Sequence, residues 1–281
     1  MSTQTISNSP ATAPSISGAQ GSQVTPLEAA VTPFGGVTIG DANVGATDTL
    51  TISLSNGGAG GALAGAGLSG GTGGVYTLSG PAATLTSQLR ALTFTPAAGQ
   101  PNTTTTTTFT LSDASSAYAT PTINSTTTVT DIDPAVAPTI SGTAGGQTTS
   151  SRTPPSPFAG VTIGDANVAA TDTLTISLSN GGAGGALSGA GLAGGTGGVY
   201  TLTGSAATIT SELDALTFTP AAGQPNTSAA TAFTLSDVSS AYAPPIVLAS
   251  FNQSNGYSPE SGLIADAAGD LFGTTDRKSV V

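Results

Sequence analysis

The stretch Thr47–Gly58, TDTLTISLSNGG, occurs again without a change as Thr171–Gly182. In each copy leucine and isoleucine alternate with threonine and serine, which is the period of a β-strand with one buried and one solvated face. Both copies belong to a longer duplication, Phe34–Tyr118 and Phe158–Tyr242, whose offset is constant at 158 − 34 = 124 residues. A repeat of this length predicts a module that folds twice in tandem.

Each copy contains roughly seven short alternating segments bounded by Gly, Pro, Asn or Ser, which is the pattern of a β-sandwich. Leu85, Leu89 and Leu92 recur at i, i+4 and i+7 and predict one or two helical turns. The sequence therefore predicts an all-β fold of two tandem Greek-key β-sandwiches, each with one short helical turn. The expected core of the first copy, and of the second at numbers 124 higher, is Phe34, Val37, Ile39, Leu50, Ile52, Leu54, Tyr76, Leu78, Leu89, Leu92, Phe94, Phe109 and Leu111.

Composition excludes several classes of function. Charged residues make up 7% of the chain and the net charge is −11, which argues against a nucleic-acid partner, because phosphate binding needs clustered Lys and Arg. The chain has no Cys and no His, so thiolate and imidazole chemistry and the usual zinc sites are ruled out. No stretch approaches the ~20 apolar residues of a membrane span, and no Sec-type signal is expected at the N-terminus.

Four blocks follow one another in the first copy: PFGGVTIGD, TLTISLSNGG, GVYTLSG with ALTFTP, and FTLSD completed by TTTVTDIDP. The second copy keeps their order, with PFAGVTIGD and GVYTLTG as variants and without the TTTVTDIDP ending. In this order they resemble the cadherin-like, immunoglobulin-like tandem repeats of large bacterial surface and secreted proteins. The resemblance implies an extracellular, cell-surface stalk or adhesin, often with Ca²⁺ stiffening the joints between domains. Its expected partners are a cell-surface glycan or protein, or a second copy of the chain.

The expected organisation follows from this duplication. Residues 1–13 form a flexible leader, 14–134 the first sandwich, 135–138 a linker and 139–245 the second sandwich. Residues 246–275 resemble the start of a GloVer-type tandem repeat through Gly262–Asp266, Gly269 and Leu271–Thr275. One such unit is expected to be poorly folded, because it cannot bury its own face alone. Residues 276–281 break this pattern and are interpreted as a sequence artefact.

The second copy departs from the first after Tyr242, where APPIVLASFN replaces ATPTINSTTTVTDIDP. Either Ile246–Leu248 takes over as its last strand, or the second sandwich keeps an open edge. We favour the replacement, because an unpaired strand edge invites association with other chains.

The candidate metal ligands are acidic and amide side chains near strand ends. Ca²⁺ takes six to eight oxygen ligands, which such groups supply. Asp and Asn are also turn formers that bond their own backbone, so both interpretations stay open. Asp131 and Asp133 lie at the joint between the modules. Two departures of the second copy count against Ca²⁺: Glu28 becomes Arg152, and Asp131 and Asp133 have no counterpart. The candidates are Asp41, Asn43, Asp48, Asp131, Asp133, Asp165, Asn167 and Asp172.

Other motifs carry no chemistry. Gly65–Gly70 and Gly189–Gly194 fit G-x-G-x-x-G, but a strand pattern follows where a dinucleotide site needs a helix. Glu212 and Asp214 are Gln88 and Arg90 in the first copy and belong to a solvated helix face. We therefore expect no catalytic residue, no cofactor besides Ca²⁺, and a non-enzymatic spacer or adhesin. The alternative is the accessory stalk of a secreted enzyme whose catalytic domain lies beyond the C-terminus.

Overall fold

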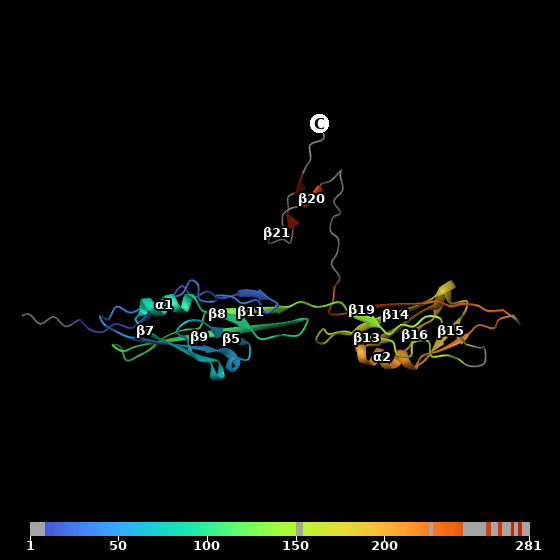
Figure 1. Cartoon of the computed structure of the whole chain (residues 1–281), viewed down its shortest axis with the longest axis horizontal. Helices are drawn as coiled ribbons and strands as arrows, with labels where there is room; N and C mark the ends of the chain where they lie inside the picture. The colour runs from blue at the N-terminus through green and yellow to red at the C-terminus, as the bar shows by residue number, and fades with distance from the viewer. Residues whose placement is uncertain are drawn as a thin grey trace, which may run out of the picture. The chain divides into compact units, whose positions relative to one another are not determined.

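The computed structural model describes residues 9–149, 154–224 and 227–243, and four short strands after them. The chain divides into two compact units, Met1–Tyr242 and Ala243–Val281. The first unit contains both copies of the duplication, called repeat 1 (residues 14–134) and repeat 2 (residues 139–243) from here on (Figure 1). Its structure is mostly β-sheet with few short helices, which confirms the predicted fold class.

The large sheet of repeat 1 is built around two central strands, β4 (Asp48–Leu54) and β9 (Thr103–Ser115). Its strand order is β2-β11-β9-β4-β7-β6, and β10 pairs with β9 as well. All these neighbours are antiparallel except β2 and β11, which run parallel. The remaining strands are β2 (Gln23–Pro26), β6 (Ser69–Gly70), β7 (Val75–Gly80), β10 (Thr122–Asn124) and β11 (Thr128–Asp133).

The opposing layer of repeat 1 consists of two strand pairs and a helix. The pairs are β5 (Gly61–Ala64) with β8 (Thr93–Pro96), and β1 (Ser15–Ser17) with β3 (Thr38–Gly40). The helix is α1 (Ala82–Arg90). The chain crosses repeatedly between the layers, since β4, β6, β7 and β9 lie in the large sheet and β5 and β8 oppose it. These crossings produce the two-layer sandwich.

One core fills the space between the layers of repeat 1. All thirteen predicted residues are buried, and Leu63, Leu85 and Val129 join them. Helix α1 is nine residues long, longer than one turn, and buries Leu85 and Leu89 one turn apart. The ring of Phe109 meets Phe34 and Phe94 edge to face, with centroid distances of 5.2 and 5.0 Å. Burying each large side chain is worth roughly 1.5–3 kcal/mol, so this core is the main source of stability.

Within the glycine-rich segment between β4 and β7, two stretches of backbone pack directly against each other. The 3-10 turns η1 (Ser55–Gly58) and η2 (Thr72–Gly74) contact each other there. Gly74 has φ +72°, and a Cβ on it would lie 2.5 Å from the backbone nitrogen of Gly58. Only glycine meets both constraints. The segment Gly65–Gly70 ends in strand β6, and the short turn η2 and strand β7 follow it instead of the α-helix that a dinucleotide site needs.

The end of repeat 1, residues 121–133, is divided between two strands. Two strands form there, β10 and β11, separated by residues 125–127. The side-chain oxygen of Asn124 accepts the backbone N–H of Thr126 at 3.0 Å, and this local bond interrupts the strand. β10 then pairs with the second half of β9, while β11 pairs with its first half.

Repeat 2 reproduces most of these elements. Its larger sheet has the order β16-β17-β14-β19, and its smaller pairs are β15 with β18 and β12 with β13. At the N-terminus of its helix α2, the Ser205 hydroxyl accepts the N–H of Thr208 at 3.2 Å. The elements are β12 (Thr139–Ser141), β13 (Thr162–Gly164), β14 (Asp172–Leu178), η3 (Ser179–Gly182), β15 (Gly185–Ser188), β16 (Ala193–Gly194), η4 (Thr196–Gly198), β17 (Val199–Gly204), α2 (Ala206–Ala215), β18 (Thr217–Pro220) and β19 (Phe233–Ser239).

The two repeats differ at one sheet edge. β19 has 7 residues where β9 has 13, and within the described part of repeat 2 no strand takes the place of β2, β10 or β11. Phe233 and Leu235 are consequently only partly buried, although their counterparts Phe109 and Leu111 are fully buried. Ile246–Leu248, the predicted replacement strand, lies outside the described residues.

The second unit is described only through four strands. β20 (Tyr257–Pro259) pairs with β23 (Thr275–Asp276), and β21 (Ile264–Ala265) pairs with β22 (Leu271–Phe272). The predicted GloVer-type repeat and the interpretation of residues 276–281 otherwise fall outside the described residues. In the part of the chain that is described, no helix has the length and apolar character needed to cross a membrane.

The matched pair Phe109 and Phe233 tests the difference between the two edges. Phe109→Ala leaves a cavity in a closed core and should cost on the order of 3–5 kcal/mol. Phe233→Ala should cost clearly less, because that ring is already partly exposed. Hydrogen exchange read by mass spectrometry reports the two repeats separately. Equal losses of protection in the two variants would contradict the difference between the covered edge of repeat 1 and the open edge of repeat 2.

Candidate metal centres

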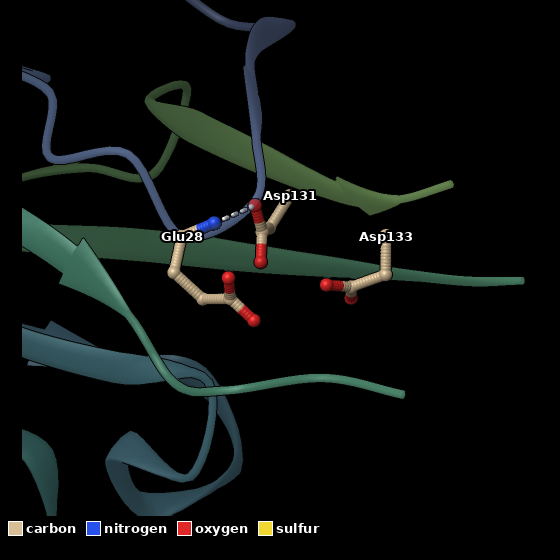
Figure 2. A group of neighbouring side chains, drawn as sticks. All are labelled: Glu28, Asp131 and Asp133. Carbon is tan, nitrogen blue, oxygen red and sulfur yellow. Dashed lines mark hydrogen bonds between the residues drawn. The ribbon is translucent and has the colours of Figure 1, made fainter. Parts of the chain in front are cut away.

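Three acidic side chains converge at one end of repeat 1. Glu28, Asp131 and Asp133 each offer a carboxylate oxygen, and these atoms all lie within 4.8 Å of one another. Figure 2 shows the three carboxylates pointing toward a shared space. Within residues 9–149, 154–224 and 227–243 this is the one group of three acids that meets this distance. We call it the joint site, because β11 is the last strand of repeat 1 before the linker.

Strand β11 positions two of the three acids. Side chains along a strand alternate between its faces, so Val129, Asp131 and Asp133 share one face. Val129 is a core residue and the exposed fractions of Asp131 and Asp133 are 3% and 6%, whereas Ile132 between them is 39% exposed. The Asp-x-Asp spacing therefore continues the buried face of the strand with two carboxylates.

A strained turn brings Glu28 to the same place. The Ala29 N–H donates to the Pro26 carbonyl at 3.1 Å, and the two residues between them, Leu27 and Glu28, have φ of +50° and +54°. Positive φ at both central residues is the geometry of a type I′ turn, which normally takes Asn or Gly. The turn follows β2, the strand that runs parallel to β11, so it ends beside Asp131.

Hydrogen bonds hold the joint site but leave one buried oxygen free. The Glu28 N–H donates to Oδ1 of Asp131 at 3.2 Å, and the Gly99 N–H donates to Oε1 of Glu28 at 2.9 Å (Figure 2 shows the first bond). The Thr103 hydroxyl donates to Oδ2 of Asp133 at 3.2 Å. Oδ2 of Asp131 is buried and has no hydrogen-bond partner among the described residues. A Cβ on Gly99 would collide with the Asp133 carboxylate, so the loop closes tightly over the site.

Within the described residues, no positively charged side chain neutralises these carboxylates. Among the residues described, Arg90 is the one basic side chain, and it donates to the Val37 carbonyl at 2.8 Å and to the Thr38 hydroxyl. Burying carboxylates without a positive partner is costly. A hard divalent cation removes that cost, and the oxygen-only donor set suits Ca²⁺. Glu28, Asp131 and Asp133 would hold such an ion.

The aspartates and asparagines of the predicted loops do come together in both repeats. Oδ1 of Asp41 accepts the N–H of Asn43 at 2.7 Å, and Asp165 accepts that of Asn167 at the same distance. Each asparagine amide also binds the backbone of the chain entering its repeat. Oδ1 of Asn43 accepts the Thr12 N–H at 2.9 Å, and Oδ1 of Asn167 accepts the Val136 N–H at 2.7 Å. These amide oxygens are already engaged as acceptors.

Asp48 lies deeper and meets an acid that the sequence did not reveal. Asp48 and Asp113 are both fully buried, on neighbouring strands of the large sheet. Burial, together with a contact from the Asp41 carboxyl group, raises the pKa of Asp48 to about 6. Burial and the charges of Asp48 and Asp41 raise the pKa of Asp113 to about 6. The pKa of Asp172 rises to about 6, and that of Asp237 also rises, burial being the first cause of each.

Sequence reasoning left Glu28, Asp113 and Asp237 out of the candidate ligands, although it noted that Arg152 replaces Glu28 in the second copy. Glu28 is the only acidic residue before Asp41, which is a weak signal that could have marked it. Asp113 and Asp237 end the alternating pattern FTLSD on its buried face, so strand periodicity alone could have placed them inward. Glu212 and Asp214 lie on helix α2 away from these clusters, and Asp214 accepts the Gly160 N–H at 2.9 Å.

Comparison with known proteins gives little. No family model matches the sequence, and no curated protein matches it. One solved structure with some similarity is the C-terminal domain of the AgI/II polypeptide BspA of Streptococcus agalactiae. It is 10% identical, with a TM-score of 0.22, covering 79% of this chain and 93% of that chain. A TM-score this low does not show a shared fold, so no argument about this chain depends on it.

The raised pKa values predict how stability depends on pH when divalent cations are removed. Between about pH 4 and 6 the folded protein keeps protons on Asp48, Asp113 and Asp172 that the unfolded chain, with a pKa of 3.8, has released. The free energy of unfolding should therefore fall as the pH rises through this window, then level off. Thermal denaturation in a chelator from pH 4.5 to 7.5 measures it. A midpoint that rises with pH would contradict the assignment, and Asp48→Asn with Asp172→Asn should flatten the curve.

Proposed function

We propose that this chain is a non-enzymatic array of structural and adhesive modules, a spacer or adhesin of a large bacterial extracellular protein. Ca²⁺ bound at the joint site stiffens the exit of repeat 1. The observation that carries this proposal is the buried, unpartnered oxygen of Asp131, which lies within 4.8 Å of ligand oxygens from Glu28 and Asp133. Its expected partners are a cell-surface glycan or protein, or another copy of the chain.

The position of the joint site supports a mechanical role. Glu28, Asp131 and Asp133 belong to three places: the turn after β2 and two successive inward positions of β11. An ion shared by these carboxylates ties the start of repeat 1 to its last strand. It also fixes the loop that carries Gly99, whose N–H is bonded to Glu28. Two residues further on, the Pro101 carbonyl accepts the N–H of Val168 in repeat 2 at 3.0 Å. Stiffening this loop would limit bending between the repeats.

The chemistry of the chain supports a non-enzymatic role. Nucleophilic and general-base catalysis most often depend on Cys or His, and the sequence has neither. The acids that are held close together lie at strand ends inside a sandwich, with their carboxylates turned into the protein. The outward faces of the central strands carry Thr and Ser, which suit a solvated stalk. A surface of this kind binds through many weak polar contacts.

Calcium binding at the joint site can be measured directly. Millimolar CaCl₂ should raise the unfolding temperature of the chelator-treated chain, because a ligand at 100 times its Kd adds about 2.7 kcal/mol to the folded state. Glu28→Gln removes one carboxylate, but the amide oxygen of glutamine can still accept the Gly99 N–H. This variant should lose the part of the calcium stabilisation that comes from the joint site. Asp214→Asn removes an exposed acid elsewhere and serves as the control. Equal calcium responses in the two variants would refute the joint site.

Adhesion and spacing need a separate measurement. Small-angle scattering of the whole chain should show a narrower range of dimensions with Ca²⁺ than with chelator, because the joint is stiffer. Beads coated with the chain should then cluster with each other or bind bacterial cells more strongly in Ca²⁺ than beads coated with the Glu28→Gln variant. Unchanged scattering together with unchanged bead binding would leave neither part of the proposal standing.

A further inference from the structure

We infer that each repeat holds a site for a divalent cation, separate from the joint site, inside the sandwich at one end of its core. Its ligands are Asp41, Asp48 and Asp113 in repeat 1, and Asp165, Asp172 and Asp237 in repeat 2. We call these the core-end sites. They extend the calcium proposal to the interior of each module, and they stand or fall independently of the joint site because they share no residue with it.

The strand register brings the acids of repeat 1 to one place. In the pairing of β4 with β9, Asp48 lies opposite Ser115 and Leu50 lies opposite Asp113. Side chains of directly paired residues point to the same face, so Asp48 and Asp113 both follow the inward direction of Leu50. Along both strands, Asp48 and Asp113 take the inward positions next to the last buried leucines, Leu50 and Leu111. Asp41 comes directly after β3 in the opposing layer, so acids from both layers meet at the core end.

Five carboxylate oxygens in each core-end site are buried and form no hydrogen bond of normal geometry with the described residues, although the Ser115 hydroxyl lies near Asp41 and Asp48 and the Ser239 hydroxyl lies near Asp165. In repeat 1 they are Oδ2 of Asp41 and both oxygens of Asp48 and Asp113. In repeat 2 the same five atoms recur at Asp165, Asp172 and Asp237. Asp48, Asp113 and Asp172 are fully buried, so solvent does not satisfy them. A pattern that returns atom for atom 124 residues later reflects a requirement of the module.

Two species could neutralise these oxygens, a proton or a cation. Protonating Asp48 and Asp113 supplies two O–H donors, and each engages the oxygen that carries the proton and one acceptor oxygen. Protons therefore leave one of the five buried oxygens unsatisfied, and they leave the charge of Asp41 in place. A cation of the Ca²⁺ class binds six to eight oxygens and can take all five. The oxygen count therefore favours the cation, while protons replace it at acidic pH.

The neighbouring groups leave room for this ion. Asn43 and Asn167 are not among its ligands, because their amide oxygens accept backbone N–H groups. In repeat 2, Asp165 borders a hollow of about 350 Å³ lined also by Val136, Ala137, Thr139, Gly164 and Ala166. The hollow provides space for water beside Asp165, so a cation bound there could keep water as a remaining ligand.

Binding must draw the three carboxylates together. Ligands on opposite sides of Ca²⁺ at 2.3–2.6 Å are at most about 5 Å apart. The acids of the joint site already satisfy this limit, whereas within the described residues those of the core-end sites do not form such a group. The cation therefore pulls the ends of β4 and β9 toward the loop after β3. This closure distinguishes the core-end sites from the joint site, which is formed in advance.

Counting bound ions on the whole chain tests the inference. Native mass spectrometry with CaCl₂, supported by calorimetric titration, should find three Ca²⁺ ions in the unchanged protein: one in each core-end site and one in the joint site. The double variant Asp113→Asn, Asp237→Asn should bind one ion, and Glu28→Gln should bind two. Asp214→Asn, the matched surface control, should bind three.

The outcomes separate the two calcium proposals. Loss of two ions in the double variant with none lost in Glu28→Gln supports the core-end sites and refutes the joint site. A double variant that binds as many ions as the unchanged chain overturns the core-end sites. If the double variant fails to fold, the number of Ca²⁺ ions bound by the unchanged chain still tests the inference, because the joint site alone accounts for one. A single bound ion that disappears in Glu28→Gln, or no bound ion at all, shows that the core-end acids are held by protons and overturns the inference.

Discussion

The pairing of β4 with β9 is the constraint on which the rest of repeat 1 depends. Its register sets Leu50 and Ile52 beside Leu111 and Asp113, so one ladder positions both the apolar core and the acids that close it. In repeat 2, β14 and β19 correspond to β4 and β9, and they pair in the same register. A slip of one residue would turn every one of these side chains to the other face. The apolar core and the core-end acids are therefore specified together.

The second repeat shows what the last strands of the first contribute. Strand β11 covers the first half of β9, adds Val129 to the core and carries Asp131 and Asp133. Within its described residues repeat 2 has none of these, and the ring of Phe233 is partly exposed where that of Phe109 is buried. The closed edge and the joint site thus come from one strand, so the loss of that strand removes both at once.

Among the residues that the structure describes in the two repeats, most acidic side chains are buried or half-buried. A chain with 15 acidic and 4 basic residues could have spread its charge over the surface. Instead its aspartates gather at strand ends, where Asp48, Asp113, Asp131 and Asp172 are almost entirely buried. Buried carboxylates without basic partners destabilise a fold unless cations or protons neutralise them. The stability of such a module is consequently tied to the pH and the cations around it.

The sequence alone determined the features that depend on local periodicity: the strands, the helix and the buried faces. Alternation in TLTISLS fixed the strand and its buried face, the leucine spacing fixed α1, and the duplication fixed the number of modules; all thirteen predicted core residues of repeat 1 are buried. Tertiary structure alone decided which acids meet. Glu28 reaches Asp131 across 103 residues, and Asp113 reaches Asp48 only because β9 pairs with β4. Composition and spacing are local, whereas a cation site depends on strand register and turn geometry that exist only once the layers have packed.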